Sequence, residues 1–139
     1  MKRQIASILG VFGLLIVAAC ANAQTPNLKA NVPFDFVVDK AAMPAGAYSL
    51  DSLSHNTKAM AVRNHDAGIT RIVLPNTARS LNVSSDTKLV FHRYGDQYFL
   101  SQIWIQGERE GLQFNISRRE AEMAQNSQSN DVVILAELR

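Results

Sequence analysis

The sequence predicts an all-β fold, a single-domain sandwich or partly open barrel of about seven antiparallel strands with one short helix before the last strand. Apolar and polar side chains alternate with a period of two through most of residues 31–138, which is typical of half-buried strands. Gly- and Pro-containing turn signals separate these runs. The 139 residues, of which 47% are hydrophobic and 19% charged, can bury one core and are too few for two typical domains.

The N-terminus has the three parts of a secretory signal. A positive head at residues 1–4 precedes an apolar run over 5–19 and the small-residue exit Ala21-Asn22-Ala23. Fifteen helical residues would reach only about 22 Å of a roughly 30 Å hydrocarbon core, which argues against a membrane anchor. We therefore expect cleavage between Ala23 and Gln24. The predicted division is a signal peptide over 1–23 and one β domain over 24–139.

Cys20 offers an alternative to that cleavage site. Val17-Ala18-Ala19-Cys20 is similar to the box at which bacterial lipoproteins are acylated and cut. On that alternative Cys20 becomes the lipidated first residue of an outer-membrane lipoprotein. The exit at Ala23 is complete, and Leu is commoner than Val at the start of the lipoprotein box. We therefore predict a secreted or periplasmic protein, with lipidation as the alternative.

Charge and cysteine usage exclude several classes of partner and site. Removing the leader removes two of the 14 basic residues and leaves twelve basic and twelve acidic side chains. A net charge of zero argues against nucleic acid, which binds through excess Lys and Arg. A single cysteine excludes an internal disulfide framework and any multi-cysteine metal site. We expect no cofactor, an unidentified protein or envelope surface as partner, and membrane attachment only through the leader or Cys20.

Strands are expected over 31–39, 46–53, 58–63, 69–74 and 132–138. Pro33 lacks a backbone donor, so the first strand lies at an edge or begins pairing after it. Met43-Pro44-Ala45-Gly46 forms the turn before the second strand. The run 69–74 is apolar on both faces, which favours a central position in a sheet. Residues 76–86 are expected to be mostly loop.

A hairpin over 87–106 carries the strongest local signal. Gly95-Asp96 between two β-rich runs fits a two-residue turn in which Gly takes positive φ. This turn pairs Tyr94 with Gln97 and Phe91 with Leu100. On that register the shared core face consists of Leu89, Phe91, Leu100 and Trp104. The same register places Arg93 beside Tyr98, where a cation–π contact is possible.

The one expected helix begins at a capping box. The Ser117 side chain should accept from the third helical N–H while Glu120 reaches back to the Ser117 N–H. A helix of about eight residues is not stable alone in water. We expect it to dock through Met123 and Ala124, or else to fray.

The order of these motifs carries a resemblance. Val32-Pro33-Phe34-Asp35-Phe36, the turn before Tyr48, the hairpin around Gly95 and Ser117-Arg118-Arg119-Glu120 occur together. With them, the whole mature chain resembles a group of small secreted proteins of acidobacteria and related soil bacteria. The resemblance implies the same β architecture and export, and no catalytic residues, because that group has no assigned activity. A Leu-Pro pair precedes the helix-capping Ser in the group, whereas Asn115-Ile116 stands here.

Candidate catalytic and metal-binding side chains do not form a known motif. His55, His65 and His92 lack the spacing of paired metal ligands, and no Gly-x-Ser-x-Gly elbow is present. Glu108 and Glu110 could form an acid and base pair, but nothing nearby buries one of them. We expect no enzyme, no catalytic residue and no metal site. A hydrolase with a convergent site would have to bring His92, His65 or Glu108 beside a second titratable group in a cleft.

Aromatic side chains give the best lead to a ligand. Tyr94, Tyr98 and Trp104, with Tyr48, could form a flat patch for a sugar ring or line the mouth of an apolar pocket. The leading hypothesis is a non-catalytic secreted or envelope-associated β module that acts by contact with a protein or a surface. The alternative is a carrier or binding module for a lipid or glycan on the same scaffold.

The mass of the exported protein tests the leader. We expect an intact mass that corresponds to a chain beginning at Gln24, because signal peptidase cuts after a small-x-small exit. A mass corresponding to a chain beginning at a diacylated Cys20 would establish the lipoprotein alternative instead. Replacing Cys20 with Ala should leave the mass of the exported protein unchanged, since Cys20 belongs to the removed segment.

Overall fold

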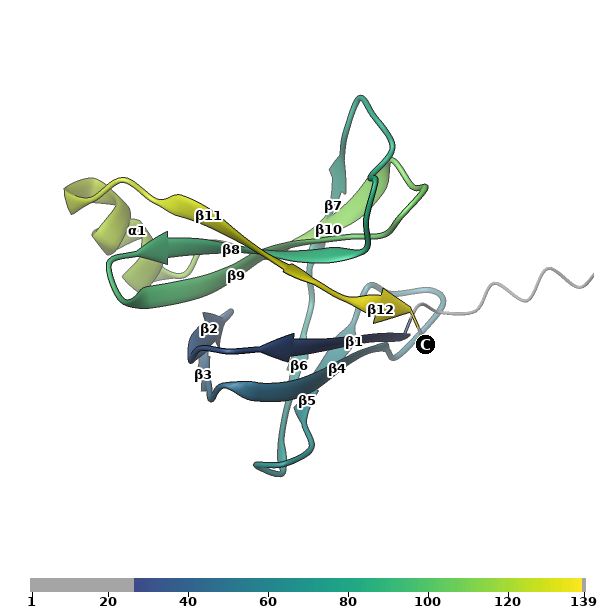
Figure 1. Cartoon of the computed structure of the whole chain (residues 1–139), viewed down its shortest axis with the longest axis horizontal. Helices are drawn as coiled ribbons and strands as arrows, with labels where there is room; N and C mark the ends of the chain where they lie inside the picture. Colours follow the sequence, from purple (N-terminus) through teal and green to yellow (C-terminus); the bar gives the residue numbers. More distant parts are fainter. Residues whose placement is uncertain (1–26, 139) are drawn as a thin grey trace, which may run out of the picture.

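A computed structural model describes residues 27–138 as two facing β-sheets with one helix (Figure 1). The first sheet has the strand order β12-β1-β4-β5-β6, and the second has the order β11-β8-β9-β10-β7. A small hairpin, β2–β3, joins the second sheet through β2 beside β9. The predicted leader, with Cys20, Ala23 and Gln24, lies outside the described residues. The strands are β1 (Asn27–Val32), β2 (Phe36–Val38), β3 (Ala41–Met43), β4 (Gly46–Ser52), β5 (Met60–Asn64), β6 (Ile69–Val73), β7 (Asn76–Arg79), β8 (Lys88–Tyr94), β9 (Gln97–Trp104), β10 (Glu110–Gln113), β11 (Asn130–Leu135) and β12 (Glu137–Leu138), and the helix is α1 (Arg118–Asn126).

Four stretches of chain leave one sheet and enter the other. β1 passes to β2 through Pro33, β3 passes to β4 through Pro44-Ala45, β6 passes to β7 through Leu74-Pro75, and β11 passes to β12 through Ala136. The three proline residues lack the N–H that a continuous ladder needs, so pairing stops there. These switches give twelve short strands, so the expected number of about seven is wrong. They also divide the expected strand over 31–39 between two sheets, which do not close into a barrel.

The interior between the sheets follows the predicted alternation. Phe36, Leu89 and Leu100 are 4%, 1% and 4% exposed, which confirms their inward orientation. The Phe36 ring meets the Phe91 ring edge-on, with centroids 5.2 Å apart, and the Tyr48 ring with centroids 5.0 Å apart. Because Phe91 lies on β8 and Tyr48 on β4, this aromatic chain connects the two sheets.

The β8–β9 hairpin confirms the predicted turn and its nearby register. Tyr94 pairs with Gln97 and Phe91 with Leu100. Gly95 has φ +58°, the left-handed conformation that the turn requires. The Arg93 guanidinium carbon lies 5.5 Å from the centre of the Tyr98 ring, so the expected cation–π contact is present.

A β-bulge changes the other half of the same hairpin. Phe91 pairs with Leu100 but Val90 pairs with Gln102, so Ser101 is an extra residue in β9. The shift turns Ile103, 1% exposed, into the core beside Leu89. Trp104 is therefore on the outer face, and its predicted place in the core is wrong. The alternation of side chains could not reveal the extra residue.

Two further expectations are corrected at the sheet edges. β6 is an edge strand of the first sheet, and Ile72 and Leu74 are 69% and 66% exposed, so the predicted central position is wrong. The segment 76–86, expected as loop, contributes β7, which pairs with β10. Both corrections have the same cause, because β6 and β7 turn a corner between sheets at Pro75.

Helix α1 begins at the predicted cap, but a side chain other than those predicted docks it on the sheet. The Glu120 N–H donates to Ser117 Oγ at 3.2 Å, which is half of the capping box. The Glu120 side chain does not return to Ser117; it is buried against His92 of β8. Met123 is half-buried and Ala124 is exposed, so a buried carboxylate replaces the expected apolar anchor. Among residues 27–138 no helix is long and apolar enough to cross a membrane.

Replacing Gly95 with Val should destabilise the protein by about 1 kcal/mol or more, because a β-branched residue tolerates positive φ poorly. A Cβ at this position would meet no atom within 4 Å, so the cost is conformational and not steric. For a domain of this size the melting temperature should fall by about 4 °C. Gly95→Asn is the control, since Asn adopts this conformation more readily and should lose less. Equal melting temperatures for the Val variant and the parent would contradict the turn.

Candidate functional site

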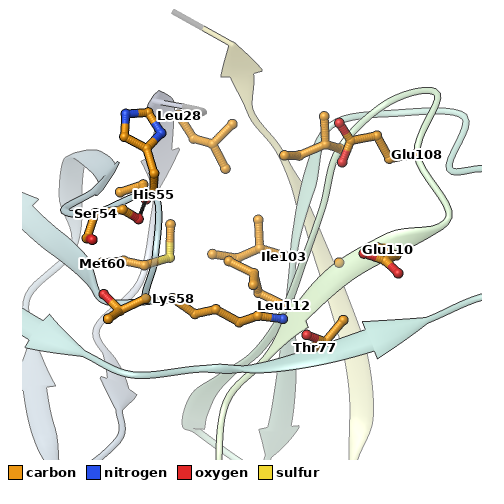
Figure 2. Close-up of a pocket in the computed structure, with 14 residues that line it drawn as sticks. Leu28, Ser54, His55, Lys58, Met60, Thr77, Ile103, Glu108, Glu110 and Leu112 are labelled. Atoms are coloured by element: carbon orange, nitrogen blue, oxygen red, sulfur yellow. Dashed lines mark hydrogen bonds between the residues drawn. The ribbon is translucent and has the colours of Figure 1, made fainter. Parts of the chain in front are cut away.

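A cavity of about 340 Å³ opens between the two sheets (Figure 2). Ile103 and Ile105 line it, so it lies at the end of β9 that is remote from the β8–β9 turn. Its floor consists of apolar side chains from four strands of both sheets. Leu28, Met60 and Ile103 are each 1–2% exposed, and Leu112 is half-buried. The floor residues are Leu28 of β1, Met60 of β5, Ile103 of β9 and Leu112 of β10. The cavity is therefore an opening into the shared core.

Polar side chains surround this apolar floor. Ser54, His55 and Lys58 come from the connection between β4 and β5, and Figure 2 shows them on one side of the cavity. Glu108 and Glu110 stand on the other side. A lysine and two glutamates therefore line the cavity from opposite sides. The Lys58 side chain extends across the base of the cavity toward Leu112 (Figure 2).

A loop closure on one side and a strand pairing on the other hold the two sides of the mouth in place. The Leu53 N–H donates to the Ala59 carbonyl at 2.9 Å and closes the loop that carries His55. On the other side the Arg79 guanidinium contacts Glu110 at 3.1 Å across the β7–β10 pair. Both side chains of that ion pair are well exposed, so it contributes less than about 1 kcal/mol. The loop closure and the strand pairing, and not this ion pair, set the width of the opening.

Gly111 allows the cavity wall to form. A Cβ at Gly111 would lie 2.6 Å from the Ile103 carbonyl oxygen and 2.7 Å from the Trp104 ring. No side chain fits there, so β10 approaches β9 closely and the Trp104 ring covers Gly111. Leu112, the next residue, pairs with Ile103 and faces the cavity.

The three aromatic residues proposed from the sequence do not lie together. Tyr94 is buried on the outer face of the second sheet, and its ring packs against Phe99 with centroids 5.8 Å apart. Tyr98, on the opposite face, stacks on Phe34 with centroids 3.8 Å apart. Trp104 lies at the far end of β9, half-buried. None of the three lines the cavity in Figure 2.

The three histidines have separate environments. His55 lies on the rim of the cavity. His65 Nε2 lies 3.0 Å from Ser49 Oγ on the first sheet. His92 is partly covered, with its Nδ1 2.7 Å from Glu120 Oε1. Within residues 27–138 no group of three or more His, Cys, Asp or Glu side chains could hold a metal ion.

Sequence reasoning found part of the cavity rim and none of its floor. Glu108 and Glu110, which are candidates because of their spacing, lie at the mouth. Leu28 precedes the first expected strand, and Thr77 lies in a segment expected as loop. The floor residues carry no chemical signal, because buried Leu, Met and Ile are ordinary core residues.

Comparisons with known protein families, characterised proteins and solved structures find no match to this chain.

The stability of the protein should fall above about pH 10, partly because of Tyr94. Burial raises the pKa of the Tyr94 hydroxyl above its ordinary value of 10, and the nearby Glu120 carboxylate raises it further. The folded state therefore holds the neutral phenol more tightly than the unfolded state does, and this contribution is lost as the pH rises through the folded pKa. In denaturant titrations, Tyr94→Phe should lose less stability than the parent between pH 8 and pH 11. Identical losses in the two proteins would contradict this role for Tyr94; Tyr48, whose pKa burial also raises, is retained in both.

Proposed function

We propose that this chain is an exported β module that binds the apolar part of a small ligand in the cavity between its sheets. The observation that carries the proposal is the combination of a cavity of about 340 Å³ with a floor of Leu28, Met60 and Ile103. Sites for small molecules are concave, largely apolar and of roughly 300–1,000 Å³. The cavity therefore favours the carrier or binding module over the broader contact hypothesis.

The rim defines the rest of the ligand. Lys58, whose side chain crosses the base of the cavity, and Glu108 at its mouth place opposite charges beside the apolar floor. An amphipathic molecule can place its apolar group against Ile103 and leave its polar group at the mouth, where side chains and water satisfy it. A lipid and a glycan would not fit this cavity equally well, since a lipid fragment supplies an apolar group that can pack against the floor. The cavity supports a small amphipathic lipid fragment better than a sugar.

Export remains part of this proposal, with support from the predicted leader. Contact with another protein or with an envelope surface stays a prediction. The exposed Ile72 and Leu74 on the β6 edge are the feature that such a contact would use.

A plug at the mouth tests the proposal. Thr77 is an exposed residue of β7 that lines the cavity and pairs with Leu112. Replacing Thr77 with Phe should weaken the binding of N-phenyl-1-naphthylamine, a neutral fluorescent amphiphile, by about tenfold or about 1.4 kcal/mol. Fluorescence titration of the exported protein measures the affinity.

Thr70→Phe is the matched control. Thr70 is an exposed strand threonine of β6 that does not line this cavity. Its replacement adds the same apolar ring and should leave the affinity of the probe within about twofold, a change of about 0.4 kcal/mol. Equal affinities in the two variants would show that the probe binds elsewhere and would overturn the proposal.

A further inference from the structure

The side chains of a serine, a histidine and a buried glutamate contact one another in a row on the outer face of the second sheet. Ser101 Oγ is 3.1 Å from His92 Nε2, and His92 Nδ1 is 2.7 Å from Glu120 Oε1. These contacts connect β9, β8 and α1, where the helix lies against the turn end of the hairpin (Figure 1). The two ring nitrogens thus have separate partners, a hydroxyl on one side and a carboxylate on the other.

The carboxylate fixes the state of the imidazole. Glu120 is 4% exposed and accepts from His92 Nδ1–H and from the Tyr94 hydroxyl, the latter at 3.3 Å. With the proton on Nδ1, the Nε2 lone pair faces Ser101 and can accept its hydroxyl proton. Asp131, whose Oδ1 lies 3.8 Å from Nε2, is the other charged group facing the ring.

We propose that Ser101 is a nucleophile for acyl transfer, with His92 as its general base and Glu120 as the residue that positions the imidazole. The proposal departs from the expectation that the chain is not an enzyme. It is independent of the cavity, which none of the three residues lines.

The bulge places Ser101 in this position. As the extra residue of β9, Ser101 lies on the outer face together with Gln102, and bulges commonly redirect a side chain at a functional site. The Trp104 Nε1–H donates to Gln102 Oε1 at 3.0 Å. Since that N–H can only donate, the Gln102 amide N–H₂ remains free to donate to a carbonyl oxygen on this face.

The surroundings define the substrate as a small carboxylic ester. Ser101 is buried, at 7% exposed, and the adjoining His92 side chain is 27% exposed, so a substrate would reach the Ser101 hydroxyl beside the exposed part of the imidazole. Val90 pairs with both Val133 and Gln102, which places two apolar side chains beside the donor amide. Val133 is 49% exposed and offers a surface for a short acyl chain.

The reaction consumes only the ester and one water molecule. Ser101 Oγ forms a bond to the carbonyl carbon as its proton passes to His92 Nε2. The C–O bond to the alcohol breaks, and His92 returns the proton to the leaving oxygen. Water then attacks the acyl-Ser101 ester by the same route and releases the carboxylic acid.

A fluorophosphonate probe with a short alkyl chain tests the nucleophile. Its phosphorus forms a bond to Ser101 Oγ, fluoride leaves, and His92 takes the proton. We expect a single adduct on the folded exported protein, assigned to Ser101 by peptide mass spectrometry and absent from Ser101→Ala. His92→Gln should slow labelling about 100-fold or more, the ordinary contribution of a general base. Glu120→Gln should slow it about tenfold or more, because it no longer fixes the productive tautomer.

A second serine–histidine pair in the chain provides the matched control. Ser49 Oγ lies 3.0 Å from His65 Nε2, but the nearby carboxylate, Asp51 Oδ2, contacts Ser49 at 3.4 Å and not the other nitrogen of His65. Ser49→Ala should therefore leave labelling unchanged. Thermal unfolding followed by circular dichroism establishes that each variant is folded at the labelling temperature.

Two outcomes would overturn the proposal. One is a folded parent protein without an adduct on Ser101. The other is an adduct whose rate is the same in the folded His92→Gln variant, which would show that His92 and Glu120 serve only to dock the helix. A labelling rate that falls on acidification in the parent and stays flat in His92→Gln would support the base, since a protonated imidazole cannot accept the Ser101 proton.

Discussion

The packing of the two sheets against each other depends on aromatic contacts that cross the space between them. Phe91 is fully buried on β8, and its ring meets Phe36, which in turn meets Tyr48 on the first sheet. Edge-to-face aromatic pairs add about 0.5–1.5 kcal/mol each beyond the area that they bury. Phe36 can reach both neighbours because the chain leaves the first sheet at Pro33 and returns through the β2–β3 hairpin in the second. Phe36 therefore contacts both Phe91 and Tyr48 only because the chain switches sheets at Pro33.

The same interior explains the cavity. The aromatic chain fills the space between the sheets at one end, whereas Leu28, Met60 and Ile103 leave a recess at the other. Smaller aliphatic side chains line the recess, and the β4–β5 connection and the β9–β10 turn stand around it without covering it (Figure 2). A ligand bound there would complete the burial of a core that the chain leaves open at that end.

The bulge at Ser101 decides which side chains of β9 face the core and which face outward. Before it, Leu100 faces the core; after it, Ile103 does, and the two residues between them face outward. Without the extra residue, Trp104 would enter the core and Ile103 would leave the floor of the cavity. One inserted residue thus sets both the apolar floor and the position of the Ser101 hydroxyl beside His92.

Local patterns in the sequence were enough to predict the all-β class, the Gly95 turn with its register, the cap at Ser117 and the inward orientation of Phe36, Leu89 and Leu100. Each rests on a local signal, either a period of two or a residue suited to one backbone conformation. Tertiary structure decided the sheet switches, the exposure of Ile72, the outward position of Trp104 and the meeting of Glu120 with His92. Strand partners, bulges and contacts over 28 residues of chain depend on what packs opposite, and no neighbouring residue encodes that.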